Sequence, residues 1–492
     1  MTMSVKKIVQ GVLIFSLASI WAMAQKDPGV RGGPAGGGQP LPGLQVNEGK
    51  LFEEGKFRAT ELESTCDKCS EFVPGSPTGD NPVLAVHTNS AGLGARFNAD
   101  QCAACHNQPA VGGSGGFMVP NPQDPQHPLP PENPQFRLIP HRFGQTNEVP
   151  SFETQFGPIR EVRFRFKPDG TRDGGVHQLW TVVGRQDDPT IPNCRISQPD
   201  FDVEFAKGNL TFRIPTQLFG LGIIDSIQDQ EILKHFAATA AQRQNFGIQG
   251  RPNHSGNDGT ITRFGWKAQN KSISIFSGEA YNVEMGVTNE AFPQAVEENE
   301  ACNGPNKPHP NDVVRVATND ATNDGFDNPL HIMPDWSMFM LFMRFLDAPQ
   351  PAAFSPSAQR GREVFATVGC ALCHTPAMQT APVMNSAALQ AKTANLYSDL
   401  LLHHMGANLD DEIIQGEAGP DEFRSAPLWG VGQRIFFLHD GRTNNLLEAI
   451  DQHFSAPTTK FPNGSEANKS VQAFNALSVA QKQDLLNFLR AL

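Results

Sequence analysis

Two runs of the form Cys-x-x-Cys-His lie far apart in the chain, at residues 102–106 and 370–374. Two thiols separated by two residues can add to the two vinyl groups of one porphyrin, and a histidine directly after them can reach its iron. The runs therefore predict two covalently attached c-type haems, with His106 and His374 as the proximal iron ligands. The attaching thiols would be those of Cys102, Cys105, Cys370 and Cys373. Two structural zinc loops or redox dithiols are the alternative interpretation.

The residue on the other side of each iron decides what a haem can do. An iron with two strong protein ligands only passes electrons, whereas an iron with an open sixth position binds peroxide or oxygen. Histidine and methionine supply the candidates. For the second haem they are His403, His404, Met405, His439 and His453, and for the first they are His87, His141, His177, His235 and His254. Each of these histidines can equally be an ordinary surface residue.

The start of the chain predicts export. Lys6 and Lys7 precede a mostly apolar run from Ile8 to Ala22, which ends in small residues. This order is typical of a secretory signal peptide, here cleaved after Ala24. No second apolar run of about 18 residues follows, so we expect a soluble periplasmic protein without a permanent membrane span, an uncleaved anchor being the alternative. Because c-type haem is attached outside the cytoplasm, the signal peptide and the haem runs support one another.

The charge balance is acidic, with 51 Asp and Glu against 39 Lys and Arg and a formal net charge of −12. Removal of residues 1–24 takes away two lysines and no acid, which moves the charge from −12 to −14. Nucleic acid is therefore not an expected partner. An acidic surface suits a basic soluble electron carrier, and it equally serves solubility alone.

Four of the eight cysteines lie outside the haem runs. In an oxidising compartment they are expected to form two disulfides, with three possible pairings. These cysteines are Cys66, Cys69, Cys194 and Cys302. The Cys-x-x-Cys spacing of the first two also occurs in redox dithiols, although no βαβ pattern surrounds it.

The sequence predicts a mainly α-helical protein, with two cytochrome c-like lobes that each position one haem. Its 492 residues suffice for a large core. We expect an N-terminal haem domain at 45–346 and a C-terminal haem domain at 357–492, joined by the proline-containing segment 347–356. Residues 25–44 are rich in Gly and Pro and predict a flexible tether.

The C-terminal domain has the clearest helix signals. A helix from Ser357 to Val368 would deliver Cys370 directly to its haem. Ser478 is a plausible N-cap for an amphipathic helix at Val479–Leu492, which can pack across the first helix.

The N-terminal domain is predicted to contain a β-rich insertion at about 119–250. Residues 162–166 alternate apolar and charged side chains, and a Pro-Asp-Gly turn at 168–170 leads to a returning strand at 176–183. A helix is expected at 225–243. Strands and loops would thus interrupt an otherwise helical lobe.

Segments of both halves resemble a known family. The residues that carry the resemblance are 369–376, 397–406, 424–430 and 437–442, together with 96–98 beside the first haem run and 263–269. They resemble the bacterial di-haem oxidoreductases, a family described as peroxidases or thiol oxidoreductases, over most of residues 90–492. The chain is similar, more distantly, to di-haem cytochrome c peroxidases and to the di-haem enzymes that oxidise tryptophans of a partner protein.

The resemblance implies particular ligands. His453 stands where the peroxidases have an axial methionine and the tryptophan-oxidising enzymes a tyrosine, and Met405 is the alternative ligand. Residues 282–286 resemble the segment that places an acid over the peroxidatic iron. Glu284 would then move a proton from the near to the far oxygen of peroxide. Glu279 is the neighbouring alternative, and a solvated glutamate is the other interpretation of Glu284.

The resemblance also implies a function. The second haem would accept electrons from a small carrier, a cytochrome c or a cupredoxin, and the first would reduce peroxide. Trp266 or Trp429 would relay electrons between them or serve in packing. Two other hypotheses about the function stay open. In the first, the protein is an electron-transfer cytochrome with both irons six-coordinate. In the second, it is an oxidase of thiols or protein side chains that uses Cys66 and Cys69.

Overall fold

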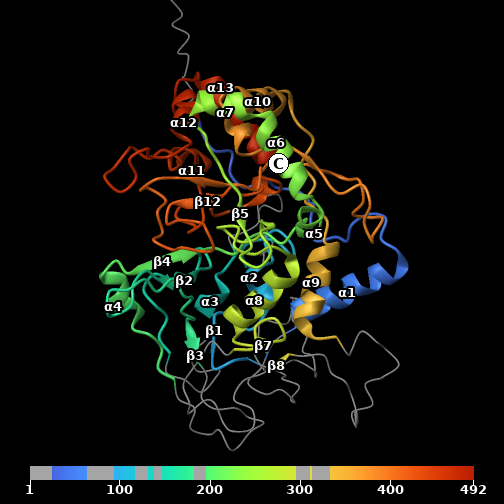
Figure 1. The fold of residues 1–492 in the computed structure, drawn as a ribbon, viewed down its shortest axis with the longest axis vertical. Helices are drawn as coiled ribbons and strands as arrows, with labels where there is room; N and C mark the ends of the chain where they lie inside the picture. The colour runs from blue at the N-terminus through green and yellow to red at the C-terminus, as the bar shows by residue number, and fades with distance from the viewer. Residues whose placement is uncertain are drawn as a thin grey trace, which may run out of the picture.

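The computed structural model describes residues 25–61, 63, 93–116, 131–137, 147–181, 196–294, 311–312 and 333–492. The predicted signal peptide, the four cysteines outside the haem runs, and the candidate ligands His87 and His141 lie outside the described residues. Helices make up most of the regular secondary structure of the described part, and each of its sheets has two short strands (Figure 1).

Helices α10 (Pro356–Thr367) and α13 (Val479–Ala491) pack together at the top of Figure 1, where the sequence predicts them. The Ser478 hydroxyl caps α13 as expected, accepting a hydrogen bond from the backbone of the first turn. Gly361 permits close approach, because a Cβ at this position would lie 1.9 Å from the Asp484 carbonyl oxygen. The same part of the chain contains α11 (Leu446–Asp451), α12 (Asn468–Asn475) and the 3-10 turns η3 (Cys370–Leu372) and η4 (Val431–Gln433).

The other helical group is built on α1 (Val46–Thr60) and α9 (Asp335–Phe345). The rings of Phe52 and Phe342 lie 5.5 Å apart between these helices, and α8 (Ile273–Met285) packs on α9. Shorter helices complete the described set: α2 (Cys102–Cys105), α3 (Pro134–Arg137), α4 (Phe201–Ala206), α5 (Leu221–Asp225), α6 (Asp229–Ala238) and α7 (Ala240–Phe246). The predicted helix at 225–243 is thus divided between α6 and α7, with a break at Thr239.

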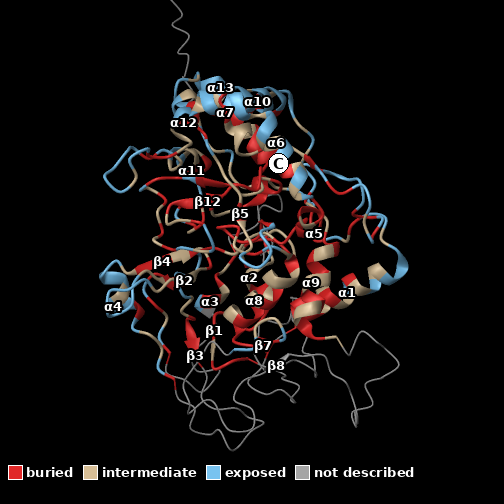
Figure 2. Ribbon diagram, viewed as in Figure 1, coloured by how far each residue is buried: buried red, intermediate tan, exposed pale blue. Residues whose placement is uncertain are grey.

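Two hydrophobic clusters form the main core, and the buried positions follow them in Figure 2. The smaller cluster contains Phe365 and Phe488 of the α10–α13 pair. The larger cluster surrounds α1, α8 and α9, and it also takes in Met378 and Leu396 from the predicted C-terminal domain. The segment that follows the second haem run therefore packs on the N-terminal half. No helix of the described residues is long and apolar enough to cross a membrane.

The strands are short and pair only in twos in the described residues, so they connect loops and form no extended sheet. Four antiparallel pairs are β1 (Arg96–Phe97) with β3 (Trp180–Thr181), β5 (Asn253–His254) with β6 (Ile261–Thr262), β9 (Met378–Gln379) with β10 (Thr393–Ala394), and β11 (Leu402–His404) with β12 (Glu422–Arg424). The strands β2 (Glu161–Phe164) and β4 (Leu210–Arg213) form a further antiparallel pair, and β7 (Thr288–Asn289) and β8 (Asn311–Asp312) are parallel.

The predicted hairpin forms only in part. The turn at 168–170 exists, and single bridges join Arg163 to Val176 and Phe166 to Arg172. The continuous ladder of β2 (Glu161–Phe164) instead runs along β4 (Leu210–Arg213), about fifty residues downstream. Local alternation of apolar and charged residues predicts a strand but cannot choose its partner, because distant strands compete for the same backbone groups.

Residues 25–44, expected as a flexible tether, lie along the folded protein. The Asp27 carboxylate is 2.7 Å from the guanidinium of Arg490 on α13, and Arg31 donates its backbone N–H to Gly432 at 2.8 Å. Farther along, Leu41 donates its backbone N–H to Phe345 at 2.8 Å. A composition that is flexible in isolation is therefore fixed here by contacts with both helical groups.

Candidate haem-binding sites

The first haem run lines a large cavity. Cys102 and Cys105 lie on α2 and His106 directly after it, and all three border about 1250 Å³ of empty space. The His106 Nδ1 atom lies 3.2 Å from the Gly113 carbonyl oxygen, which fixes the imidazole ring. Burial lowers the pKa of His106 to about 4, so the ring is neutral at pH 7. A neutral imidazole is the form that binds iron.

Carboxyl groups line another part of this cavity. Glu284 of α8 accepts a hydrogen bond at 2.8 Å from the side-chain amide of Asn98, whose own carbonyl oxygen accepts the Leu179 N–H at 3.0 Å. Burial, with the nearby charge of Glu161, raises the pKa of Glu284 to about 8. Glu279, the alternative acid, also lines the cavity and pairs with Asn270. Glu284 therefore lies in the same cavity as the first haem run.

The second haem run lines another cavity, with about 1500 Å³ of empty space. His374 and His453 both border it, and each ring is held through Nδ1. The acceptors are the Tyr397 carbonyl oxygen at 3.1 Å and the Ala449 carbonyl oxygen at 2.7 Å. Burial lowers the pKa of both imidazoles, to about 4 for His374. With Nδ1 bound to a carbonyl, Nε2 is the nitrogen left for a metal.

A family model described as "Di-haem oxidoreductase, putative peroxidase" matches residues 202–492, more than half of the chain. The chain belongs to this family. The family is described as di-haem, so membership implies two haems, and it confirms the resemblance seen in the sequence. No curated protein matches the chain by sequence.

Several solved structures show weak likeness to this di-haem oxidoreductase. The di-haem peroxidase BthA from Burkholderia thailandensis is 14% identical with a TM-score of 0.26, over 47% of this chain and 65% of that one. A MauG-like protein associated with microbial copper homeostasis is 16% identical with a TM-score of 0.25, over 50% and 77%. Kuenenia stuttgartiensis hydrazine synthase is 16% identical with a TM-score of 0.21, over 34% and 56%. Likenesses this weak support no conclusion about function.

Each cavity is lined by a haem run, and buried arginines also line both cavities. These arginines are a second feature that fits haem. Arg424 and Arg434 border the second cavity, and burial lowers the pKa of both to about 10, which still leaves them charged at pH 7. The Arg434 Nη2 atom has no hydrogen-bond partner among the described residues, and the same holds for Nε of Arg160 in the first cavity. A buried cation calls for an anion. The two propionates of a haem are carboxylates of the required charge.

The remaining candidate ligands of the second haem differ in their surroundings. Met405 lines the cavity in a cluster with Trp266 and Phe423, and His439 stacks on Phe423 at 4.3 Å. His403 also borders the cavity, but carboxylates hold both of its ring nitrogens, Asp399 at 3.0 Å and Glu466 at 2.9 Å. His404 is half exposed, pairs with Asp421 at 3.0 Å and does not line the cavity.

The described candidates for the first haem lie elsewhere. His177 stacks on Phe164, and His235 and His254 pair with glutamates at 3.1 and 3.0 Å. None of the three lines the first cavity. Two methionines that the sequence analysis did not single out, Met285 and Met343, do line it.

Sequence reasoning also missed a charged group on the paired strands β2 and β4. Glu161, Arg163 and Arg213 all line the first cavity. Their alternating positions are visible in the sequence, but only the pairing of two distant strands places them together. Trp266 lines both cavities, and its Nε1 donates to the Ile214 carbonyl at 2.9 Å.

Proposed function

We propose that the protein is a periplasmic di-haem c-type peroxidase that reduces peroxide at its N-terminal haem. The observation that carries the proposal is the position of Glu284 in the same cavity as Cys102, Cys105 and His106. A carboxyl group whose pKa is raised to about 8 can donate a proton at neutral pH. When bound, the haems supply irons that exchange electrons one at a time.

Glu284 is the proposed general acid and base of the reaction. Reduction of hydrogen peroxide breaks the O–O bond, takes up two electrons and two protons, and releases two water molecules. The Glu284 carboxyl group gives its proton to the far oxygen and receives the proton of the near oxygen, so that water is the leaving group. Asn98 orients the carboxyl group through its 2.8 Å hydrogen bond. The electrons come from a reduced small carrier protein.

The C-terminal site is proposed to receive those electrons. Cys370 and Cys373 would attach the second haem, and His374 and His453 would supply neutral imidazoles oriented by backbone carbonyls. Two imidazoles favour the ferric state more than an imidazole and a thioether do, so a lower reduction potential is expected than with Met405 as ligand. The acidic chain suits a basic cytochrome c or cupredoxin as donor. Trp266, which lines both cavities, is the proposed relay.

Covalent attachment, export and lobe structure belong to the same proposal. Residues 1–24 would be the signal peptide cleaved during export, and two cytochrome c-like lobes at 45–346 and 357–492 would each hold one haem. The N-terminal lobe would carry the insertion at about 119–250. The strands β2 and β4 of this insertion contribute to the wall of the first cavity.

One observation favours a second candidate function. Met285 and Met343 line the first cavity, and a thioether is a common axial ligand of c-type haem. If either methionine closed the sixth position, the protein would transfer electrons without reducing peroxide.

The test is peroxide consumption by the haem-loaded protein with a reduced small electron carrier. Glu284→Gln removes the transferable proton while keeping the shape of the side chain, and we expect turnover to fall by about 10²- to 10⁴-fold with unchanged haem content. Glu204→Gln is the matched control and should keep wild-type turnover, because Glu204 is a partly exposed residue of α4 that pairs with Lys207 and does not line the first cavity. Unchanged turnover in Glu284→Gln would contradict the assignment.

A further inference from the structure

Residues 25–44 form an N-terminal arm that begins beside the helix preceding His453. The two carboxylate oxygens of Asp27 in this arm pair with Nε and Nη2 of Arg490 on α13, each at 2.7 Å. One of the same oxygens accepts the backbone N–H of Leu446, the first residue of α11, at 2.8 Å. Asp27 therefore joins the C-terminal helix of the chain to the first turn of α11.

The pair of Asp27 and Arg490 is shielded from water. The two side chains are only 7% and 4% exposed. Arg490 is fixed by further contacts, because it also donates to the Arg434 carbonyl oxygen at 3.0 Å and its guanidinium lies 5.1 Å from the centre of the Phe437 ring. A two-pronged pair between an arginine and a carboxylate has a defined geometry. Asp27 therefore presents an ordered acceptor to Leu446.

The first turn of α11 has backbone N–H groups that find no acceptor within the helix. The side-chain oxygen of Asn445 caps two of them, those of Leu447 at 2.9 Å and Glu448 at 3.4 Å. The N–H of Leu446 is the one that donates to Asp27. The segment of α11 thus provides part of its own cap, and the arm provides another part from more than four hundred residues upstream.

α11 leads directly to His453. The helix spans only Leu446–Asp451, and His453 follows two residues after its end. The imidazole Nδ1 lies 2.7 Å from the Ala449 carbonyl oxygen, and the His453 backbone N–H donates to the Ile450 carbonyl at 3.1 Å. Leu446, Ala449 and His453 all line the second cavity. Because the helix is so short, a shift of its first turn would also move the imidazole.

The arm is held along its length, so Asp27 is not a loose end. The carbonyl oxygen of Gly36 accepts the Gln350 backbone N–H at 2.8 Å. Gly38 passes close to the loop that follows the first haem run, since a Cβ at this position would lie 2.9 Å from the Cβ of Ala110. The arm therefore contacts the loop beyond the first haem run and the helix that precedes His453.

We propose that Asp27 is a positioning residue of the second haem site, which holds α11 in the place that brings the His453 imidazole to the iron. The inference rests on the proposed function, in which His453 is the axial ligand. Asp27 does not line the second cavity and acts through Leu446 and α11. It lies three residues beyond the proposed cleavage after Ala24, so the mature chain would retain it.

The experiment is a cyanide titration of the oxidised, haem-loaded protein, followed by electron paramagnetic resonance and carried far above the concentrations that saturate the first haem. Cyanide binds the second iron only when His453 has left it, so the concentration that half-converts this haem measures how firmly the imidazole is held. Asp27→Ala removes the acceptor of the Leu446 N–H and the counter-charge of Arg490. We expect the half-converting concentration to fall by about tenfold or more.

Leu41→Ala is the matched control. Leu41 is a buried residue at the other end of the arm, and it belongs to the larger hydrophobic cluster, whereas Leu446 belongs to the smaller one. This variant should lower the thermal stability and leave the titration of the second haem at its wild-type position. Asp27→Asn keeps the shape and one oxygen acceptor, so it should lie between the wild type and Asp27→Ala, and it serves as the test if Asp27→Ala does not fold. Haem content and thermal unfolding check the folding of each variant.

A titration of Asp27→Ala that coincides with that of the wild type would overturn the inference. An equal shift in Leu41→Ala would also overturn it, because the effect would then be one of general stability. His453→Ala separates this inference from the function on which it rests. If the second haem of His453→Ala stays low-spin and resists cyanide as the wild type does, the ligand assignment of the proposed function fails, and the inference fails with it.

Discussion

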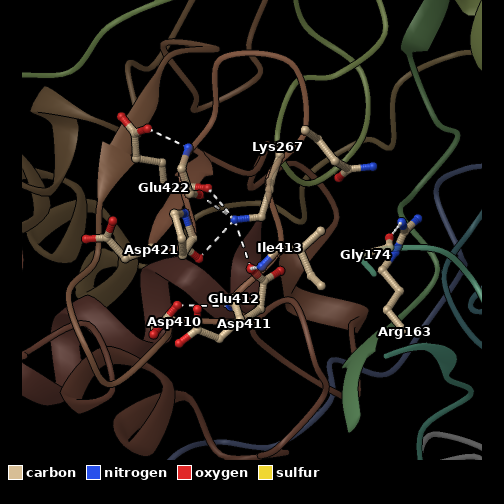
Figure 3. Close-up of polar contacts among 12 residues, drawn as sticks. Arg163, Gly174, Lys267, Asp410, Asp411, Glu412, Ile413, Asp421 and Glu422 are labelled. Carbon is tan, nitrogen blue, oxygen red and sulfur yellow. Dashed lines mark hydrogen bonds and ion pairs between the residues drawn. The ribbon is translucent and has the colours of Figure 1, made fainter. Parts of the chain in front are cut away.

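The Lys267 ammonium group lies 3.0 Å from the Asp411 carboxylate, and neither side chain is exposed to solvent. The ammonium also donates to the carbonyl oxygens of Gly419, Pro420 and Glu422 at 2.8 to 3.1 Å (Figure 3). Through its other oxygen Asp411 pairs with Arg213, which lines the first cavity. One buried carboxylate therefore compensates two buried cations, one of which borders a haem-binding cavity.

Replacement of Asp411 by asparagine should destabilise the protein strongly. Arg213 and Lys267 would be left buried without their counter-charge, and removal of one partner from a buried pair costs about 3–5 kcal/mol. The free energy of unfolding by denaturant measures the loss. Asp410→Asn is the matched control, because Asp410 pairs with the half-exposed Lys460 and should cost less than about 1 kcal/mol. Equal losses in the two variants would contradict this account.

The pH dependence of turnover follows from Glu284. Burial and the charge of Glu161 raise its pKa to about 8, so the protonated, donating form is present below that pH. Turnover should therefore hold through neutral pH and fall as the pH rises through about 8. An ordinary glutamate would lose its proton near pH 4. A profile of peroxide turnover that already falls between pH 4 and 6 would show that another group supplies the proton.

His453→Ala should convert the second haem to a high-spin form, because the imidazole that lines its cavity is removed. Optical and electron paramagnetic resonance spectra of the oxidised protein report the spin state. Met405→Ala is the companion variant, since Met405 borders the same cavity. A low-spin signal that survives His453→Ala and disappears in Met405→Ala would assign the ligand to the methionine.

Covalent attachment is tested by haem that stays with the chain after denaturation. The wild-type protein should retain two haems, and the double variant Cys370→Ser/Cys373→Ser should retain one. Cys66→Ser/Cys69→Ser should keep both haems and full peroxide turnover. Loss of turnover in this last variant would instead favour oxidation of thiols or side chains.

The haem runs and the terminal helices could be predicted because their signals are local. Cys370 and Cys373 are separated by the spacing that one porphyrin requires, and Ser478 precedes an amphipathic pattern that becomes α13. The family match over residues 202–492 supports the resemblance found in the same segments. His453, one of five candidate ligands in the sequence and the one that the resemblance singled out, lines the cavity of the second haem run.

The first cavity could be predicted only in part, because its wall comes from distant segments. Glu284 was named from a weak local likeness, but Glu161 and Arg213 meet only when β2 pairs with β4. The choice of strand partner depends on tertiary packing rather than on local sequence. In the same way, the Gly- and Pro-rich composition of residues 25–44 gave no sign that Asp27 would pair with Arg490.

The most direct test of the central claim is electron paramagnetic resonance of the oxidised and half-reduced protein, with and without cyanide. A peroxide-reducing iron needs an open coordination position, and cyanide binds such an iron and converts it from high spin to low spin. We predict a high-spin ferric signal that cyanide removes, together with a low-spin signal that cyanide leaves unchanged. Two low-spin signals that cyanide does not alter in either redox state would show that the protein only transfers electrons.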